Sequence, residues 1–201
     1  MTSKERITEL YNSLEWIRKE KIQGDFVECG VWKGGNILGI MEYLQYHQMS
    51  DRRVWLYDTF QGMTEPTEKD IDHKGEKAIN ILESVKCYSP LQEVRSALNT
   101  SNFPESNTMI IQGDVLDTLQ VNENLPKKIA LLRLDTDWYE STKMELEILY
   151  PLVETDGVLI VDDYGHWRGS KLATDEYFQS TGNSPEFKQI DYTGILLIKK
   201  T

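Results

Sequence analysis

The chain has 201 residues, 39% of them hydrophobic and 27% charged, which is typical of a single globular domain (residues 1–201) with a core of its own. Its formal net charge of −11 argues against binding to nucleic acid or to an anionic membrane surface, because both need clustered Lys and Arg. No apolar stretch reaches transmembrane length, the start lacks the apolar core of a signal peptide, and two cysteines are too few for a disulfide framework. We therefore expect a cytoplasmic protein without membrane insertion.

The N-terminal segment, residues 1–22, is predicted to contain an amphipathic helix over about residues 5–20. Its apolar face has to be covered, either by the chain's own sheet or by a second subunit in a homodimer. The side chains on that face are Ile7, Leu10, Tyr11, Leu14 and Ile17.

Strands and helices alternate beyond this segment. Short runs rich in Val, Ile and Leu predict buried parallel strands over residues 25–31, 53–58, 108–114, 129–135 and 157–163. Helices are predicted over residues 35–47, 76–86, 90–99, 140–152 and 168–180, with a further short helix after the third strand. Residues 59–75 are polar and irregular, and a loop this long inside a compact domain is typical of a lid or a binding loop at an active site.

The C-terminal segment, residues 187–199, consists of two short β-runs joined by a turn at residues 191–194. So short a connection permits only an antiparallel hairpin. The whole pattern predicts an α/β protein with a mostly parallel, doubly wound, seven-stranded sheet, helices on both faces and a C-terminal antiparallel hairpin. This arrangement is typical of the Rossmann-like fold of Class I methyltransferases.

The first predicted strand ends in a glycine-rich turn, Glu28-Cys-Gly-Val-Trp-Lys-Gly-Gly35. Glycines let a backbone approach a ligand closely, and a helix begins directly behind them. The spacing is not G-x-G-x-x-G and no Lys-Ser/Thr pair follows, which excludes the dinucleotide fingerprint and the P-loop. A nucleoside-type ligand without a pyrophosphate remains, and Glu28 suits a cationic group such as the amino group of S-adenosylmethionine. The alternative is a tight strand–helix connection that binds no ligand.

Further acids close the second and third predicted strands. Asp58 stands where a carboxylate can accept both hydroxyls of a ribose, and Asp114 stands where one can accept from the exocyclic amine of adenine. Each signal is weak by itself because acids commonly end strands. Together with Glu28 they place an acid near the end of each of the first three strands, at one edge of the sheet.

The fourth and fifth predicted strands end in Asp135 and in the pair Asp162-Asp163. In open α/β sheets, ligands bind outside the carboxyl ends of the strands. Converging carboxylates repel one another unless a cation lies between them, and an all-oxygen site suits Mg²⁺, Mn²⁺ or Ca²⁺ better than Zn²⁺. The alternative is that Asp135 and Asp162 cap the helices that follow them.

Asp137 and His166 come shortly after these strand ends and are the candidate catalytic residues. Beside a metal at Asp135, Asp137 can accept a proton from a hydroxyl of the acceptor, although its spacing fits a helix N-cap equally well. His166 fits a base, a substrate contact or a surface loop residue, and spacing does not choose among these roles.

Several segments together resemble the macrocin O-methyltransferase family, whose members methylate sugar hydroxyls in antibiotics and related glycosides and depend on S-adenosylmethionine and Mg²⁺. The similarity spans about residues 24–200, and its most specific segment is residues 132–142. The segments are residues 27–35, 57–62, 132–142 and 161–166.

The resemblance implies roles for the candidate residues. Asp135, Asp162 and Asp163 would ligate the metal, and Asp137 would be the general base, a role that some accounts give to a metal ligand instead. The cofactor site that we predict on this basis contains Glu28, Gly30, Val31, Gly34, Gly35, Asp58, Thr59, Gly113 and Asp114.

Only about two dozen residues precede the first strand, fewer than in the family pattern, so we expect a more open acceptor side that suits a larger or exposed glycan. The leading hypothesis is methyl transfer to a sugar hydroxyl of a glycan or a glycosylated natural product. A catechol-type aromatic diol is the alternative acceptor, because it chelates the same ion. A noncatalytic cofactor-binding subunit is a further alternative, but such a subunit has no need of four acids around one cleft.

Overall fold

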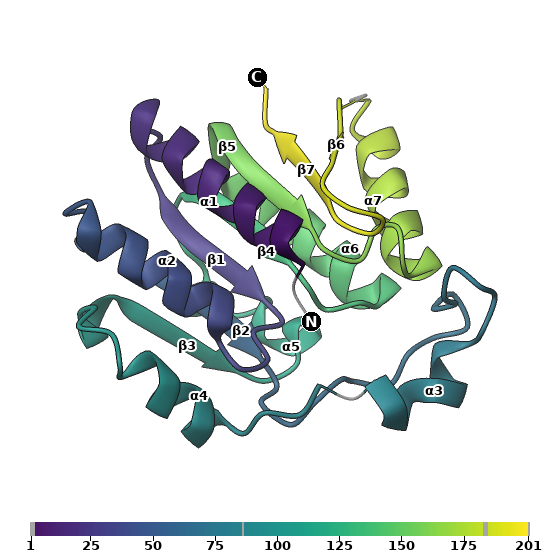
Figure 1. The fold of residues 1–201 in the computed structure, drawn as a ribbon. Helices are drawn as coiled ribbons and strands as arrows, with labels where there is room; N and C mark the ends of the chain where they lie inside the picture. The colour runs from purple at the N-terminus through teal and green to yellow at the C-terminus, as the bar shows by residue number, and fades with distance from the viewer. Residues whose placement is uncertain (1–2, 86, 183–184, 201) are drawn as a thin grey trace.

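A seven-stranded sheet forms the framework of residues 3–85, 87–182 and 185–200, which are the residues that the computed structural model describes (Figure 1). The strands are β1 (Asp25–Cys29), β2 (Val54–Asp58), β3 (Thr108–Gln112), β4 (Ile129–Leu134), β5 (Val153–Val161), β6 (Lys188–Gln189) and β7 (Ile195–Ile198). They lie in the order β3-β2-β1-β4-β5-β7-β6, with β1 to β5 parallel and β7 antiparallel to both of its neighbours. The predicted, mostly parallel sheet with a C-terminal antiparallel hairpin is thereby confirmed.

Helices cover both faces of this sheet. The helices of the described residues are α1 (Lys4–Lys19), α2 (Gly35–Tyr46), α3 (Ala78–Val85), α4 (Leu91–Leu98), α5 (Val115–Thr118), α6 (Tyr139–Ile148) and α7 (Arg168–Ser180), with short 3-10 turns at η1 (Glu105–Asn107), η2 (Asn122–Asn124) and η3 (Tyr150–Leu152). Side chains of α1, α2 and α4 pack with one face of the sheet, and those of α5, α6 and α7 pack with the other. No helix in the described ranges is long and apolar enough to cross a membrane.

Glycines end two strands earlier than the sequence predicts. β1 stops at Cys29 and β3 stops at Gln112, because the next residues, Gly30 and Gly113, adopt φ angles of 78° and 142°. These angles turn the chain out of the extended conformation, and glycine adopts them without steric cost. The two turns open the edge of the sheet where the candidate acids lie.

The connection from α6 to β5 also differs from the prediction. α6 ends at Ile148 instead of continuing to residue 152, since Pro151 cannot supply a helical N–H and a 3-10 turn takes over. β5 then begins at Val153, well before the predicted start at residue 157. Its first residues lie outside the continuous apolar run, so hydrophobicity alone does not mark them as a strand.

The N-terminal helix α1 packs on the chain's own sheet. Leu10, Leu14 and Ile17 are buried in the same core as residues of β1, β4 and β5. The indole N–H of Trp16 donates to the carbonyl oxygen of Asp156 at 2.9 Å, which ties the helix to β5. The other predicted members of the apolar face, Ile7 and Tyr11, are 56% and 53% exposed, so the homodimer stays a prediction.

The polar loop between β2 and α3 is attached to the start of α6 by Asp70, which is fully buried. Its carboxylate accepts the backbone N–H of Tyr139 at 2.7 Å, at the start of α6, and the N–H of Thr67 at 2.7 Å. A β-bridge between Asp72 and Trp167 adds a second attachment. The loop and α3 therefore hold a defined position beyond the carboxyl ends of the parallel strands (Figure 1).

We expect Leu14→Ala to lower the free energy of unfolding by about 2–5 kcal/mol, because it leaves a cavity between α1 and the sheet. Ile7→Ala on the same helix should change it by less than about 0.5 kcal/mol, because that side chain is mostly exposed. Chemical denaturation of both variants measures the difference. Equal losses would contradict the docking of α1 on its own sheet.

Candidate active site

The register of the parallel strands aligns the candidate acids in one row. Cys29 pairs with Tyr57 on one side and with Leu134 on the other, and Leu134 pairs with Val161. The residues that follow these four make up the next row across the sheet. Three of them donate their backbone N–H to a carbonyl oxygen of the neighbouring strand, at 2.8–2.9 Å. That row is Asp58, Gly30, Asp135 and Asp162, in the order β2-β1-β4-β5.

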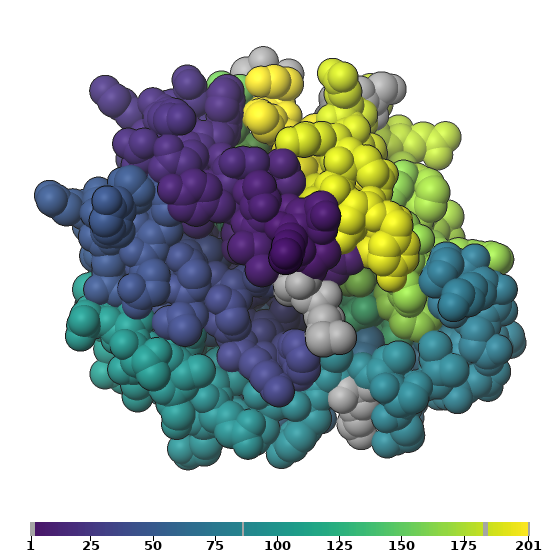
Figure 2. Space-filling model, in the orientation of Figure 1, coloured from purple at the N-terminus to yellow at the C-terminus, as the bar shows by residue number. Residues whose placement is uncertain are grey.

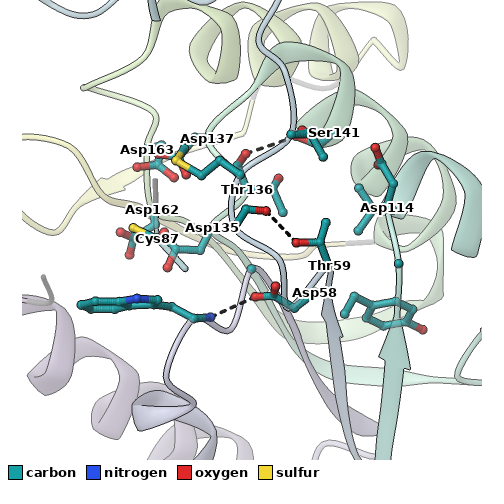
Figure 3. A pocket seen from close by; sticks show the side chains of 18 of the residues that line it. Asp58, Thr59, Cys87, Asp114, Asp135, Thr136, Asp137, Ser141, Asp162 and Asp163 are labelled. Carbon is teal, nitrogen blue, oxygen red and sulfur yellow. Dashed lines mark hydrogen bonds between the residues drawn. The ribbon is translucent and has the colours of Figure 1, made fainter. Parts of the chain in front are cut away.

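A pocket opens directly above this row. Figure 3 shows its acids in two groups, with Asp135, Asp137, Asp162 and Asp163 on one side and Asp58 and Asp114 on the other. The predicted site residues that line it are Gly30, Asp58, Thr59, Gly113, Asp114, Asp135, Asp137, Asp162 and Asp163. Further lining residues that the sequence did not suggest include Arg6, Trp32, Met63, Cys87 and Ser141.

Asp58 organises the glycine-rich turn. One carboxylate oxygen accepts the backbone N–H groups of Val31 at 2.7 Å and Trp32 at 3.0 Å, and the other accepts the N–H of Phe60 at 2.7 Å. The β1–α2 turn and the start of the β2–α3 loop are thus held around one side chain. Asp114, across the pocket, accepts the N–H of Leu116 at 2.9 Å and caps α5.

Four residues of the predicted cofactor set do not line the pocket. Glu28 is 1% exposed and accepts hydrogen bonds from Arg133 at 2.6 Å and Asn36 at 3.0 Å. Alternation along β1 directs its side chain to the face covered by α1 and α2, and its contact with a ligand stays a prediction. The remaining three, Val31, Gly34 and Gly35, shape the turn and the start of α2.

The carboxylates of Asp135, Asp162 and Asp163 offer oxygen atoms that lie within 4.8 Å of one another. Burial, opposed by Arg133 and reinforced by Asp162 and Asp137, raises the pKa of Asp135 well above its usual value. Burial together with the neighbouring acids raises the pKa of Asp163 in the same direction. In the described part of the chain, Asp163 Oδ2 is buried without a hydrogen-bond partner. Three converging oxygen donors, one of them unpartnered, fit a divalent cation such as Mg²⁺.

Arg133 lies beneath these acids and is only 3% exposed. Its Nη1 donates to Glu28 at 2.6 Å and to Asp135 at 2.8 Å, and its Nη2 donates to Asp162 at 2.5 Å. The sequence signal for this network is Arg133 itself, a charged residue inside the apolar run Ile129–Leu134. A buried arginine requires acidic partners, so its position predicts a network of this kind.

Arg6 of α1 also contacts this acidic group, through Asp162. It forms an ion pair with Asp162 and another, at 2.8 Å, with Asp191 in the β6–β7 turn. No local sequence pattern indicates this contact, because the partners are separated by most of the chain. The N-terminal helix therefore contributes a charge to the pocket.

Asp137 occupies a turn with a φ angle of 68°, in which the N–H of Trp138 donates to the carbonyl of Thr136 at 2.8 Å. Such a backbone is costly for a residue other than glycine and is found at functional sites. Asp137 Oδ1 accepts the indole N–H of Trp167 at 2.8 Å, and burial, partly offset by this bond, raises the pKa of Asp137 to about 7.

The alternative interpretation, that Asp135, Asp137 and Asp162 cap the helices that follow them, is wrong. α6 begins at Tyr139, whose N–H is bonded by Asp70, and its N-cap position is held by Trp138. α7 begins at Arg168, too far along the chain for Asp162 to cap it.

His166, the other catalytic candidate, lies outside this pocket. It lines a second cavity, formed by residues 73, 164–168, 171, 189 and 191–192. Its Nδ1 lies 3.2 Å from the hydroxyl of Tyr192, and burial, assisted by His73, lowers the pKa of His166. The chain turns after Asp163, so residues close in sequence face different cavities.

Comparisons with known proteins agree on one kind of enzyme. A family model described as macrocin O-methyltransferase (TylF) matches residues 1–199. Demethyldecarbamoylnovobiocin O-methyltransferase of Streptomyces niveus is 33% identical over 190 residues, which is 94% of this chain and 71% of that protein. The 8-demethyl-8-(2,3-dimethoxy-alpha-L-rhamnosyl)-tetracenomycin-C 4'-O-methyltransferase of Streptomyces olivaceus is 31% identical over 205 residues, or 97% and 73% of the two chains. The solved structure of the O-methyltransferase NovP superimposes with a TM-score of 0.86 at 32% identity, covering 98% of this chain and 80% of that one.

We expect Gly30→Ala to disrupt the site, because an added Cβ would lie 2.0 Å from the carbonyl oxygen of Asp135 and the φ of 78° disfavours alanine. The free energy of unfolding should fall by at least about 1–3 kcal/mol. Gly35→Ala, at the start of α2, is the control, since its Cβ meets nothing within 4 Å. Denaturation curves compare the two, and equal stability of both variants would show that the close approach at Gly30 is unimportant.

Proposed function

This chain belongs to the macrocin O-methyltransferase (TylF) family of S-adenosylmethionine-dependent enzymes, and on that premise we propose that it methylates a sugar hydroxyl in a glycan or a glycosylated natural product. The observation that carries the proposal is the presence of two acidic groups in one pocket (Figure 3), which we assign to the cofactor and to the acceptor. The names of the relatives support the acceptor class, because they give demethyldecarbamoylnovobiocin and a rhamnosyl tetracenomycin as the methylated compounds.

We assign the cofactor to the side of the pocket above β1, β2 and β3. S-adenosylmethionine, when bound, supplies a methyl group on a positively charged sulfur. Asp58 would accept from the ribose hydroxyls and Asp114 from the adenine amine, and Gly30 and Gly113 line the same side of the pocket. Thr59 lines the pocket next to Asp58. Glu28, Val31, Gly34 and Gly35 would act by shaping the turn.

We assign a divalent cation, Mg²⁺ or in its place Mn²⁺ or Ca²⁺, to Asp135, Asp162 and Asp163. The ion, when bound, supplies the positive charge that favours ionisation of a nearby acceptor hydroxyl. The proposal is supported by the convergence of three carboxylates and by the unpartnered oxygen of Asp163. Arg133 would hold Asp135 and Asp162 in position from below.

Asp137 is our proposed general base. Its Oδ1 accepts the indole N–H of Trp167, which fixes the carboxylate at the wall of the pocket, where it would accept the proton of the acceptor hydroxyl. A base works best when its pKa is near the operating pH, and burial raises the pKa of Asp137 to about 7. The metal ligands are less suited to this role, since their oxygens would be committed to the ion. His166 lines the other cavity and is not needed as the base.

Asp163→Asn is the cleanest test of the metal assignment, because Asp163 forms no ion pair among the described residues, whereas Asp162 pairs with two arginines. We expect Mn²⁺ affinity, measured by electron paramagnetic resonance, to fall by about 10–100-fold or more, with S-adenosylhomocysteine affinity kept. EDTA should abolish methyl transfer to a panel of glycosides and catechols. Asp117→Asn, an exposed acid on α5, is the control. Unchanged Mn²⁺ binding in Asp163→Asn would remove the ion from this site.

Asp137→Asn should lower turnover by about 10²–10⁴-fold, the usual contribution of a positioned general base. Mn²⁺ and S-adenosylhomocysteine should bind as tightly as to the wild type, because Asp137 is outside both ligand sets. Labelled methyl transfer to the best glycoside of the panel gives the rate, and calorimetry gives the affinities. Turnover within a few-fold of the wild type would rule out Asp137 as the base.

A further inference from the structure

Both carboxylate oxygens of Asp162 are bound by arginines. Oδ1 accepts from Nη2 of Arg133 at 2.5 Å, and Oδ2 accepts from Nη1 of Arg6, with which it forms an ion pair. Asp162 is also one of the three acids that we assign to the divalent cation. A cation that takes an oxygen of Asp162 therefore meets a guanidinium that is bound there, and two positive groups on one carboxylate repel each other.

The two arginines differ in how easily they can release Asp162. Arg133 is buried and is bonded to Glu28 and Asp135 as well, so its withdrawal would leave unpaired charges in the core. Arg6 belongs to α1, lines the pocket, and has 14% of its side chain exposed. Arg6 is therefore the arginine whose contact with Asp162 can change when a ligand enters the pocket.

Asp191 gives Arg6 a second carboxylate. Nε of Arg6 donates to Oδ2 of Asp191 at 2.8 Å, and the same oxygen accepts the hydroxyl of Ser3 at 2.8 Å. The other oxygen accepts two backbone N–H groups of the β6–β7 turn, at 2.8 and 3.0 Å. Burial raises the pKa of Asp191, but these hydrogen bonds and the charge of Arg6 lower it to about 2, so the carboxylate is ionised at neutral pH. Arg6 thus keeps an ionic partner even when it gives up Asp162.

The start of α1 packs against the β6–β7 segment, which carries Asp191. In Figure 2 the purple surface of the start of α1 lies against the yellow surface of this segment. Lys188 of β6 adds an ion pair with Glu9 of α1 at 2.6 Å. Arg6 is therefore held beside the pocket by contacts that do not involve the three acids of the proposed metal site.

We propose that Arg6 competes with the divalent cation for Asp162 and thereby lowers the metal affinity of the site. Asp191 is the acid that keeps Arg6 paired while the cation is bound. This role of Arg6 rests on the proposed function, because it takes Asp162 as a metal ligand together with Asp135 and Asp163. It adds that a residue of the N-terminal helix sets how tightly the cation is held.

Arg6→Met tests the competition, because it removes the charge and keeps an unbranched side chain. We expect Mn²⁺ affinity, measured by electron paramagnetic resonance, to rise about 10-fold, since the cation no longer has to weaken a charge-assisted hydrogen bond. Arg6→Lys keeps the charge but has one nitrogen for two acids, so it should give a smaller gain of about 3-fold. Lys4→Met is the control, because it removes the same charge from an exposed residue of α1 that does not line the pocket. Its Mn²⁺ affinity should equal that of the wild type.

The sign of the change separates competition from support, because an Arg6 that merely held Asp162 in place could only lose affinity on substitution. Wild-type or lower Mn²⁺ affinity in Arg6→Met would overturn the competition, as would an equal gain in Lys4→Met. Circular dichroism checks the fold of each variant, and if Arg6→Met does not fold, the affinity of Arg6→Lys decides by the same criterion. The metal assignment fails separately, when Asp163→Asn leaves the Mn²⁺ affinity of the wild type unchanged, and the role of Arg6 then fails with it.

Discussion

The buried side chain of Arg133 is the interaction on which the site depends. It bonds acids from three adjacent strands, Glu28 of β1, Asp135 after β4 and Asp162 after β5. A buried arginine is stable only when its charge is paired, and these acids in turn would repel one another without it. The guanidinium therefore fixes where the ends of the central strands place their carboxylates, before any ligand binds.

The charge balance of the pocket favours a further cation. Arg133 from below and Arg6 from above neutralise part of the acidic group, yet burial still raises the pKa values of Asp135 and Asp163. A divalent cation between the carboxylates would remove the remaining repulsion. Since Arg6 and the ion would share Asp162, the N-terminal helix is a part of the active site and does more than cover the sheet.

The surroundings of Asp137 illustrate how distant segments build one position. Trp167, just before α7, donates to its carboxylate, and the loop residue Asp70 takes the helix-capping role that Asp137 might have had. Asp137 is therefore free to face the pocket in a strained backbone conformation. The same Trp167 also borders the second cavity.

The sequence by itself determined the order of strands and helices and the acids at the strand ends, because apolar runs, glycine turns and chain reversals are local signals. It also predicted that Asp135 and Asp162 would converge and that Asp58 would lie at the same end of the sheet, since parallel strands bring their carboxyl ends to one edge. Only the tertiary structure decided which way individual side chains face. Strand alternation buried Glu28 against Arg133, and the turn after Asp163 directed His166 into another cavity. The contact of Arg6 with Asp162 likewise depends on helix packing across most of the chain, for which no local pattern exists.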